Sequence, residues 1–239
     1  MNDQPIKIAI LDSVPKFHWR DDNGVTDGQK FVDLLAPENV NAKFDIFYVS
    51  EYEFPDIIES YDGYLLTGSP VSVHDNHDWI KMLSEFVGQA DNKNKPIVGV
   101  CFGHQLIAKY YGGVVGNNEK GWMIGSFPLE IKKKFPWMKN TLDTTDLYHF
   151  NKERVTKLPE GAISFASTKD YPDFAYTLGN NIACLQGHPE QPKRAMYNFL
   201  EVTKKVLTEQ ELEKAKQRIE NGKSDSSVWA QWIMEFFCS

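Results

Sequence analysis

The sequence predicts an α/β protein in which helices flank a central sheet of mostly parallel strands. In its first half, short continuous apolar runs alternate with segments of helical periodicity. Continuous apolar runs are typical of parallel strands that are covered on both faces. In its second half, shorter strands separated by Gly, Pro and Asn indicate a small antiparallel extension of the same sheet. We therefore expect a single domain over residues 1–239, with a C-terminal helical segment over about 192–239.

The first hundred residues supply the parallel part of this prediction. Their strands are expected from uninterrupted apolar sequence at residues 6–11, 44–49 and 96–100, and a further short strand is expected within residues 61–70, where it breaks at Thr67. Between and after the strands, apolar residues recur at helical spacing in the segments that begin at Thr26, Asp78 and Gly103. The last of these helices is expected to stop at Gly112 and Gly113, because glycine is a frequent helix terminator.

The second half supplies the antiparallel strands and then three helices. The expected strands lie at residues 127–131, 162–168, 174–178 and 181–186. Among the helices, the second should begin with a capping box formed by Thr208 and Glu211. The last carries one apolar stripe that we assign to core packing in preference to a partner surface. The stripe consists of Trp229, Trp232, Ile233, Phe236 and Phe237.

Composition limits the function classes. The formal net charge of −7 disfavours nucleic acid and anionic membrane surfaces as partners. No apolar run reaches the length of about 18 residues that spans a bilayer, and the N-terminus resembles a first strand more than a signal peptide. Three sparse cysteines predict a reducing, cytoplasmic setting. None has zinc-site spacing, and His74–Asp78 is expected to be a loop or helix cap, so we expect neither a metal nor another cofactor.

Cys101 stands between two glycines, at the junction of an expected strand and an expected helix. Gly99-Val100-Cys101-Phe102-Gly103 fits the nucleophile elbow, a strained turn in which flanking side chains would clash. The N-terminus of the following helix would favour a thiolate, and the Phe102 N–H would face a developing oxyanion. The alternative is a buried cysteine at an ordinary glycine-rich strand end.

His188 and Glu190 offer the base that such a thiolate needs. His188 follows an expected strand directly, within "GHPE". In an extended segment, residues two apart project to the same side, so the Glu190 carboxylate can orient the imidazole. Taken alone, the pair would be a loop histidine beside a solvated glutamate. Combined with an elbow cysteine in the same sheet, the pair favours catalysis.

Gly68 is a further candidate site residue, because it closely follows a short apolar strand. A glycine there lets backbone N–H groups approach a ligand closely, and Gly68 could provide a second oxyanion donor. Without the motifs around Cys101 and His188, a simple turn would explain Gly68 equally well.

Taken together, "GVCFGHQLIA", "GHPE" and "TGSPVSV" resemble the class I glutamine amidotransferases, from about Ile6 to Leu200. The resemblance implies a flavodoxin-like α/β fold and hydrolysis of the γ-amide of glutamine or a related γ-glutamyl compound. It implies roles for six residues. The nucleophile, base and third triad member are Cys101, His188 and Glu190; the oxyanion donors are Gly68 and Phe102; the substrate contact is Gln105.

The chain departs from the family pattern at two places. Thr67-Gly68-Ser69-Pro70 stands where Gly-Gly-Pro is usual, and Asn151 and Glu153 stand where a His-x-Asp pattern is frequent. These departures bear on substrate handling more than on the triad. Residues 119–131 match a pocket-lining region in free-standing members that resemble γ-glutamyl peptide hydrolases and relatives of GMP synthetase.

The function expected from the resemblance is cysteine-dependent hydrolysis of a γ-glutamyl amide through a thioester. The ammonia acceptor stays open, because no phosphate-binding Gly-rich loop of P-loop type is found after Leu200. Either a separate synthase subunit is the partner, or the chain is a stand-alone γ-glutamyl peptide hydrolase. Two other classes remain: a cysteine-elbow protein of the chaperone or deglycase type, which "GHPE" disfavours, and a catalytically silent regulatory protein on the same fold.

Overall fold

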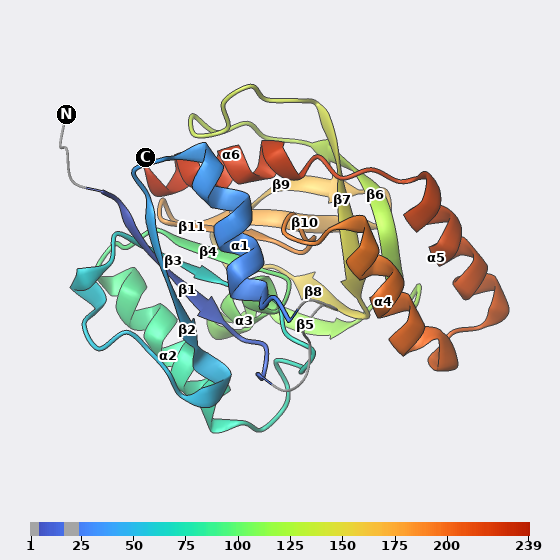
Figure 1. The fold of residues 1–239 in the computed structure, drawn as a ribbon, viewed down its shortest axis with the longest axis horizontal. Coiled ribbons are helices and arrows are strands. Elements are labelled where there is room, and N and C mark those ends of the chain that lie inside the picture. Colours follow the sequence, from blue (N-terminus) through green and yellow to red (C-terminus); the bar gives the residue numbers. More distant parts are fainter. Residues whose placement is uncertain (1–4, 17–23) are drawn as a thin grey trace.

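The core of the molecule is one nine-stranded sheet with helices on both faces (Figure 1). The computed structural model describes residues 5–16 and 24–239. The strand order is β2-β1-β3-β4-β11-β10-β9-β6-β7. The strands are β1 (Lys7–Asp12), β2 (Lys43–Tyr48), β3 (Gly63–Leu66), β4 (Ile97–Val100), β6 (Met123–Ile131), β7 (Thr144–Asn151), β9 (Ile163–Thr168), β10 (Tyr171–Leu178) and β11 (Ile182–Leu185).

The first five strands in this order are parallel and the remaining four are antiparallel, which confirms the predicted fold class. The antiparallel part continues the same sheet through the pairing of β10 with β11. A separate two-stranded ribbon joins β5 (Val114–Asn117) to β8 (Glu153–Lys157). The helices are α1 (Asp27–Leu35), α2 (Asp78–Asn92), α3 (Phe102–Tyr110), α4 (Lys193–Thr203), α5 (Glu209–Asn221) and α6 (Ser226–Phe237).

The alternating side chains of the buried parallel strands pack into two hydrophobic cores, one on each face of the sheet. In β1, Ile8 and Ile10 pack on the face that α1 and α6 cover, whereas Ala9 and Leu11 pack on the face that α2 and α3 cover. Successive side chains of a strand point to opposite faces, so a strand that is buried on both faces is apolar throughout. Among the described helices, none is long and apolar enough to cross a membrane.

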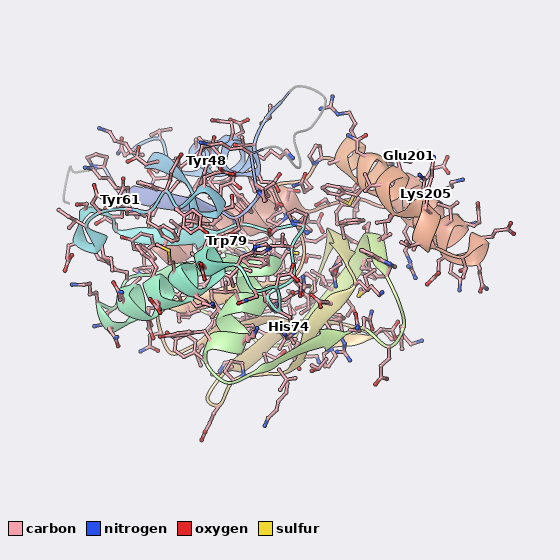
Figure 2. The ribbon with its side chains drawn as sticks, turned by 90° about the horizontal axis from the view of Figure 1, so that it is seen from below. Tyr48, Tyr61, His74, Trp79, Glu201 and Lys205 are labelled. Carbon is pink, nitrogen blue, oxygen red and sulfur yellow. The ribbon has the colours of Figure 1, made fainter. Side chains whose placement is uncertain are left out.

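The C-terminal helices confirm two of the predicted features. Thr208 Oγ1 accepts from the Glu211 N–H, and the Glu211 carboxylate accepts from the Thr208 N–H, which is the predicted capping box. The tryptophan-rich stripe of α6 is buried in the core, as predicted, with Trp232 fully covered. In contrast, α4 and α5 lie against β6 and β7 at one end of the sheet, where Glu201 and Lys205 point outward (Figure 2).

Candidate active site

Cys101 occupies a strained backbone conformation between β4 and α3. Its φ of 51° and ψ of −99° fall outside the regions that non-glycine residues ordinarily adopt, at a cost of about 1–3 kcal/mol. A Cβ added at Gly99 would lie 2.8 Å from the Gly103 carbonyl carbon, and one added at Gly103 would lie 2.6 Å from Leu66 Cβ. Both flanking glycines are therefore steric requirements of the turn, as the elbow pattern predicts.

Neighbouring parallel strands bring the expected base to the same edge of the sheet. The Cys101 N–H donates to the Leu185 carbonyl at 2.9 Å, which ties the end of β4 to the end of β11. His188 lies three residues beyond, and its N–H donates to the Tyr148 carbonyl of β7 at 2.8 Å. His188 is thus held between the parallel and antiparallel parts of the sheet.

Glu190 orients the imidazole. His188 Nδ1 and Glu190 Oε1 are 2.7 Å apart, and both side chains are buried. Burial alone lowers the pKa of His188, but the neighbouring Glu190 and Cys101 outweigh it and raise that pKa well above its usual 6.5. The surroundings therefore favour the protonated form of His188.

Gly68 lies against the side chains of both Cys101 and His188. A Cβ added to Gly68 would be 3.1 Å from His188 Cε1 and 3.6 Å from Cys101 Cβ. Only a glycine leaves the space between them open. Phe102 is the first residue of α3, so its N–H belongs to the first turn, which has no intrahelical acceptor. The two expected oxyanion donors therefore border the cysteine from the loop after β3 and from the first turn of α3.

Gln105 is positioned one turn into α3, but its amide group is already engaged. Its Nε2 donates to the Glu153 carbonyl at 2.9 Å and to Gln186 Oε1 at 3.0 Å. Its remaining acceptor, Oε1, is the atom that can receive a donor from a ligand. The Glu153 carboxylate in turn accepts from Ser72 Oγ at 2.7 Å.

All these groups surround one cavity of about 390 Å³. Five of the six expected site residues line it, and the sixth, Glu190, bonds to His188 behind the cavity wall. Beyond the cysteine, the cavity has an aromatic wall in which Phe150 lies 5.4 Å from Trp122 and 4.6 Å from Phe199, measured between ring centroids.

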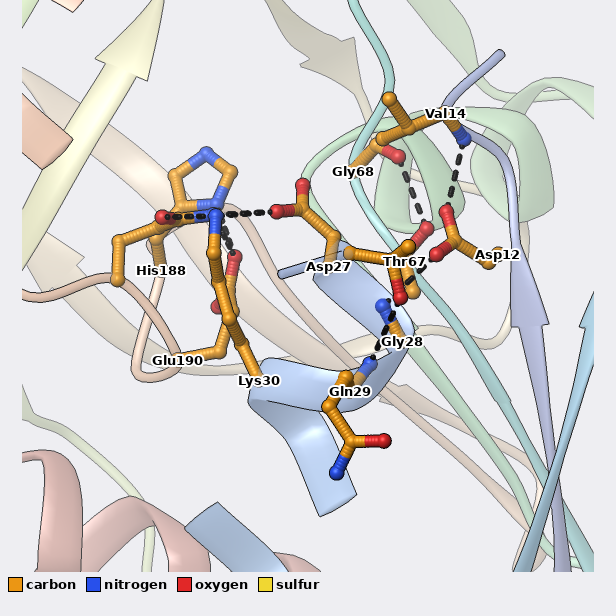
Figure 3. Close-up of polar contacts among 12 residues, drawn as sticks. Asp12, Val14, Asp27, Gly28, Gln29, Lys30, Thr67, Gly68, His188 and Glu190 are labelled. Atoms are coloured by element: carbon orange, nitrogen blue, oxygen red, sulfur yellow. Dashed lines mark hydrogen bonds and ion pairs between the residues drawn. The ribbon is translucent and has the colours of Figure 1, made fainter. Parts of the chain in front are cut away.

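Two further polar residues, Asp27 and Gln191, line the same cavity and are not among the expected site residues. Gln191 Nε2 donates to Asp27 Oδ1 at 3.0 Å and to Glu190 Oε1 at 3.2 Å, and its Oε1 accepts from Lys30 Nζ at 3.2 Å. Lys30 also pairs with Asp27 at 2.8 Å. Figure 3 shows this ion pair of α1 beside His188 and Glu190. The available signals were the position of Gln191 directly after "GHPE" and that of Asp27 in the first turn of a helix.

Asp12 lies next to this group at the carboxyl end of β1 (Figure 3). Burial, and secondly the charge of Asp27, raise the pKa of Asp12 to about 6, although hydrogen bonds from the Val14 and Gly28 N–H groups oppose the shift. Asp12 and Asp27 therefore bring two carboxyl groups to the N-terminal turn of α1.

A strained cysteine at a strand-to-helix turn, next to a histidine paired with a carboxylate, defines an α/β protein of the nucleophile-elbow class. Residues 29–203 match the family model for "Glutamine amidotransferase class-I". The chain belongs to the class-I glutamine amidotransferase family.

Individual relatives agree with this assignment. The chain is 30% identical to γ-glutamyl peptidase 3 of Arabidopsis thaliana, over 86% of both chains. It is 27% identical to the glutamine-hydrolyzing GMP synthase of Wolbachia pipientis, over 84% of this chain and 42% of that one. Its fold is similar to that of a glutamine amidotransferase from Thermotoga maritima, with a TM-score of 0.73, 18% identity, and coverage of 98% of this chain and 99% of that one.

Proposed function

We propose that the protein hydrolyses γ-glutamyl amide bonds, with Cys101 as nucleophile, His188 as proton donor and acceptor, and Glu190 as the group that orients His188. The observation that carries the proposal is the convergence of Cys101 and His188 on Gly68, together with the 2.7 Å contact between His188 Nδ1 and Glu190 Oε1. A nucleophile, a base and a group that orients the base are the minimum set for acyl transfer through a covalent intermediate.

The reaction has two halves. In the first, the Cys101 thiolate adds to the γ-glutamyl carbonyl carbon, and the oxyanion receives hydrogen bonds from the Gly68 and Phe102 N–H groups. Each such donor contributes about 3 kcal/mol in comparable sites. His188 Nε2 then gives its proton to the leaving nitrogen, the carbon–nitrogen bond breaks, and the amine departs as the tetrahedral adduct collapses to the thioester. In the second half, His188 takes a proton from water, which adds to the thioester and releases glutamate and the thiolate.

Two leaving groups are compatible with this chemistry. The aromatic wall of the cavity, formed by Trp122, Phe150 and Phe199, leaves apolar room beside Cys101 and favours γ-glutamyl peptides or other γ-glutamyl amides larger than glutamine. The similarity to γ-glutamyl peptidase 3 over most of both chains supports this candidate. The second candidate is glutamine, with ammonia passed to a separate synthase subunit, as the similarity to a GMP synthase suggests.

The decisive experiment measures glutamate release from glutamine and from a panel of γ-glutamyl dipeptides. Cys101→Ala should lower kcat/KM by at least about a thousandfold, since it removes the nucleophile. Cys184→Ala is the matched control, because Cys184 is also buried but lies within β11, away from the cavity. Glutamate release that survives Cys101→Ala at the wild-type rate would exclude the proposed nucleophile.

A second measurement separates the two candidates. A stand-alone hydrolase should release amines from γ-glutamyl peptides faster than ammonia from glutamine. An amidotransferase subunit should instead show a large rise in glutaminase rate when its partner is added. Stoichiometric labelling of Cys101 by a glutamine-like chloroketone would exclude a catalytically silent regulatory protein.

A further inference from the structure

Thr67, the residue that follows β3, has every polar group engaged. It is fully buried, and its N–H donates to the Leu11 carbonyl at 3.2 Å. Its hydroxyl accepts from the Ser13 N–H at 2.9 Å and donates to the Gly68 carbonyl at 2.9 Å. Its own carbonyl accepts from the Gly103 N–H at 3.2 Å. Thr67 thus joins the end of β1, the Gly68 loop and the first turn of α3.

These bonds fix both peptide units that flank Gly68. The Thr67–Gly68 peptide is trans and planar, so its N–H points opposite to its carbonyl. Because that carbonyl is bonded to the Gly103 N–H, the Gly68 N–H is held on the opposite side of the same peptide. The next peptide is held through the Gly68 carbonyl, which receives the Thr67 hydroxyl. A glycine that is otherwise free in φ and ψ is thereby restricted to one orientation.

We propose that Thr67 is a positioning residue that presets the Gly68 N–H for the oxyanion. The inference rests on the proposed function, in which the Gly68 and Phe102 N–H groups share one oxyanion. Phe102 and Gly103 are consecutive, so the bond from the Gly103 N–H to Thr67 couples the two halves of the oxyanion hole directly. Donors that are fixed before the reaction stabilise the transition state without reorganisation at the moment of attack.

The hydroxyl is the part of Thr67 that can be removed selectively. Without it, the Gly68 carbonyl loses its donor and the Ser13 N–H loses its acceptor. The loop keeps a second anchor, since Ser69 Oγ donates to the Ser13 carbonyl at 2.8 Å. Loss of the hydroxyl should therefore loosen Gly68 while the chain still folds.

The test compares Thr67→Val, which removes the hydroxyl at nearly constant shape, with Thr67→Ser, which retains it. Thr67→Val should lower kcat by about 10- to 100-fold and leave KM within about twofold, because a displaced donor is felt mainly in the transition state. Thr67→Ser should stay within about threefold of wild type. A γ-glutamyl aldehyde, which forms a tetrahedral adduct with the thiolate, should bind to Thr67→Val more weakly by the same factor as kcat.

Alkylation of Cys101 by iodoacetamide separates positioning from a structural role, because this displacement develops no oxyanion. Its rate should be equal in wild type and Thr67→Val.

An unchanged kcat in Thr67→Val, an equal loss in Thr67→Ser, or a parallel loss of the alkylation rate would overturn the inference. If Thr67→Val does not fold, Thr67→Ala replaces it with the same readouts. Activity in wild type with no effect of Thr67→Val would refute this inference alone, whereas an inactive wild type would refute the proposed function as well.

Discussion

Gln191 donates a hydrogen bond through Nε2 to Glu190 Oε1 at 3.2 Å, and that oxygen is also the partner of His188 Nδ1. Gln191 is itself held by Asp27 and Lys30 of α1. The carboxylate that orients the histidine is therefore fixed from the N-terminal part of the chain as well as from its own loop. Its charge acts on His188 at a constant distance.

Removal of that charge should change the pH dependence of the reaction. The charge of Glu190 helps to raise the pKa of His188 above 6.5, so Glu190→Gln should lower that pKa. In a titration towards alkaline pH, His188 would then lose its proton at a lower pH than in wild type. The alkaline limb of kcat/KM should therefore move to lower pH.

The measurement is kcat/KM between about pH 5 and pH 10, the range in which an imidazole with a raised pKa titrates. Glu153→Gln is the matched control, because it removes a carboxylate that lines the same cavity but is bonded to Ser72 and not to His188. An alkaline limb that stays in place in Glu190→Gln would contradict the assigned role of Glu190.

The elbow predicts a difference between two glycine-to-alanine substitutions. A Cβ at Gly103 would lie 2.8 Å from the Leu66 carbonyl oxygen, which is backbone, so Gly103→Ala should lower the free energy of unfolding by about 1–3 kcal/mol. Gly116→Ala is the control, since its nearest contact would be 3.7 Å from a Thr156 methyl group. Urea unfolding of both variants checks the prediction, and equal losses would show that the elbow is not sterically constrained.

His104 predicts a specific loss of stability in acid. Burial lowers the pKa of His104 to about 3 in the folded protein, against 6.5 in an unfolded chain. Between these values the unfolded state binds more protons, so the free energy of unfolding falls as pH falls from about 6.5 to 3, by on the order of a few kcal/mol.

His104→Phe should weaken this dependence on pH, because the substitution removes the buried titrating group. His77→Gln changes an exposed histidine and should leave the dependence as it is in wild type. Urea unfolding at pH 4, 5, 6 and 7 compares the slopes. Equal slopes in wild type and His104→Phe would rule out His104 as a source of the acid sensitivity.

The parallel half of the fold is predictable from sequence because its elements are defined locally. The apolar run of β1 follows from burial of this strand on both faces of the sheet. The spacing of Leu83, Phe86 and Val87 follows from burial of α2 on one face only. By contrast, β7 and β8 are not evident as strands. Residues such as Thr144, Asp146 and His149 interrupt any apolar run, and β7 is completed only by its antiparallel pairing with β6.

The difference between locally encoded features and features that depend on distant contacts also applies to the site. Cys101, Gly103 and His188 belong to short motifs that encode their own turns, so the sequence reveals them. Asp27 and Gln191 become part of the site only when α1 packs beside the loop after β11, which no local pattern encodes.

Val100 and Leu185 are partners in the adjacent strands β4 and β11, and Cys101 and His188, the proposed nucleophile and base, follow them by one and three residues. The two residues are thus brought together by a strand pairing and not by the length of chain between them. The chain between these two strands leaves the end of β4 and comes back to pair with it as β11. The connecting chain can therefore change in length at an exposed turn without moving Cys101 from His188, as long as β4 and β11 stay paired and the Tyr148 carbonyl still holds His188.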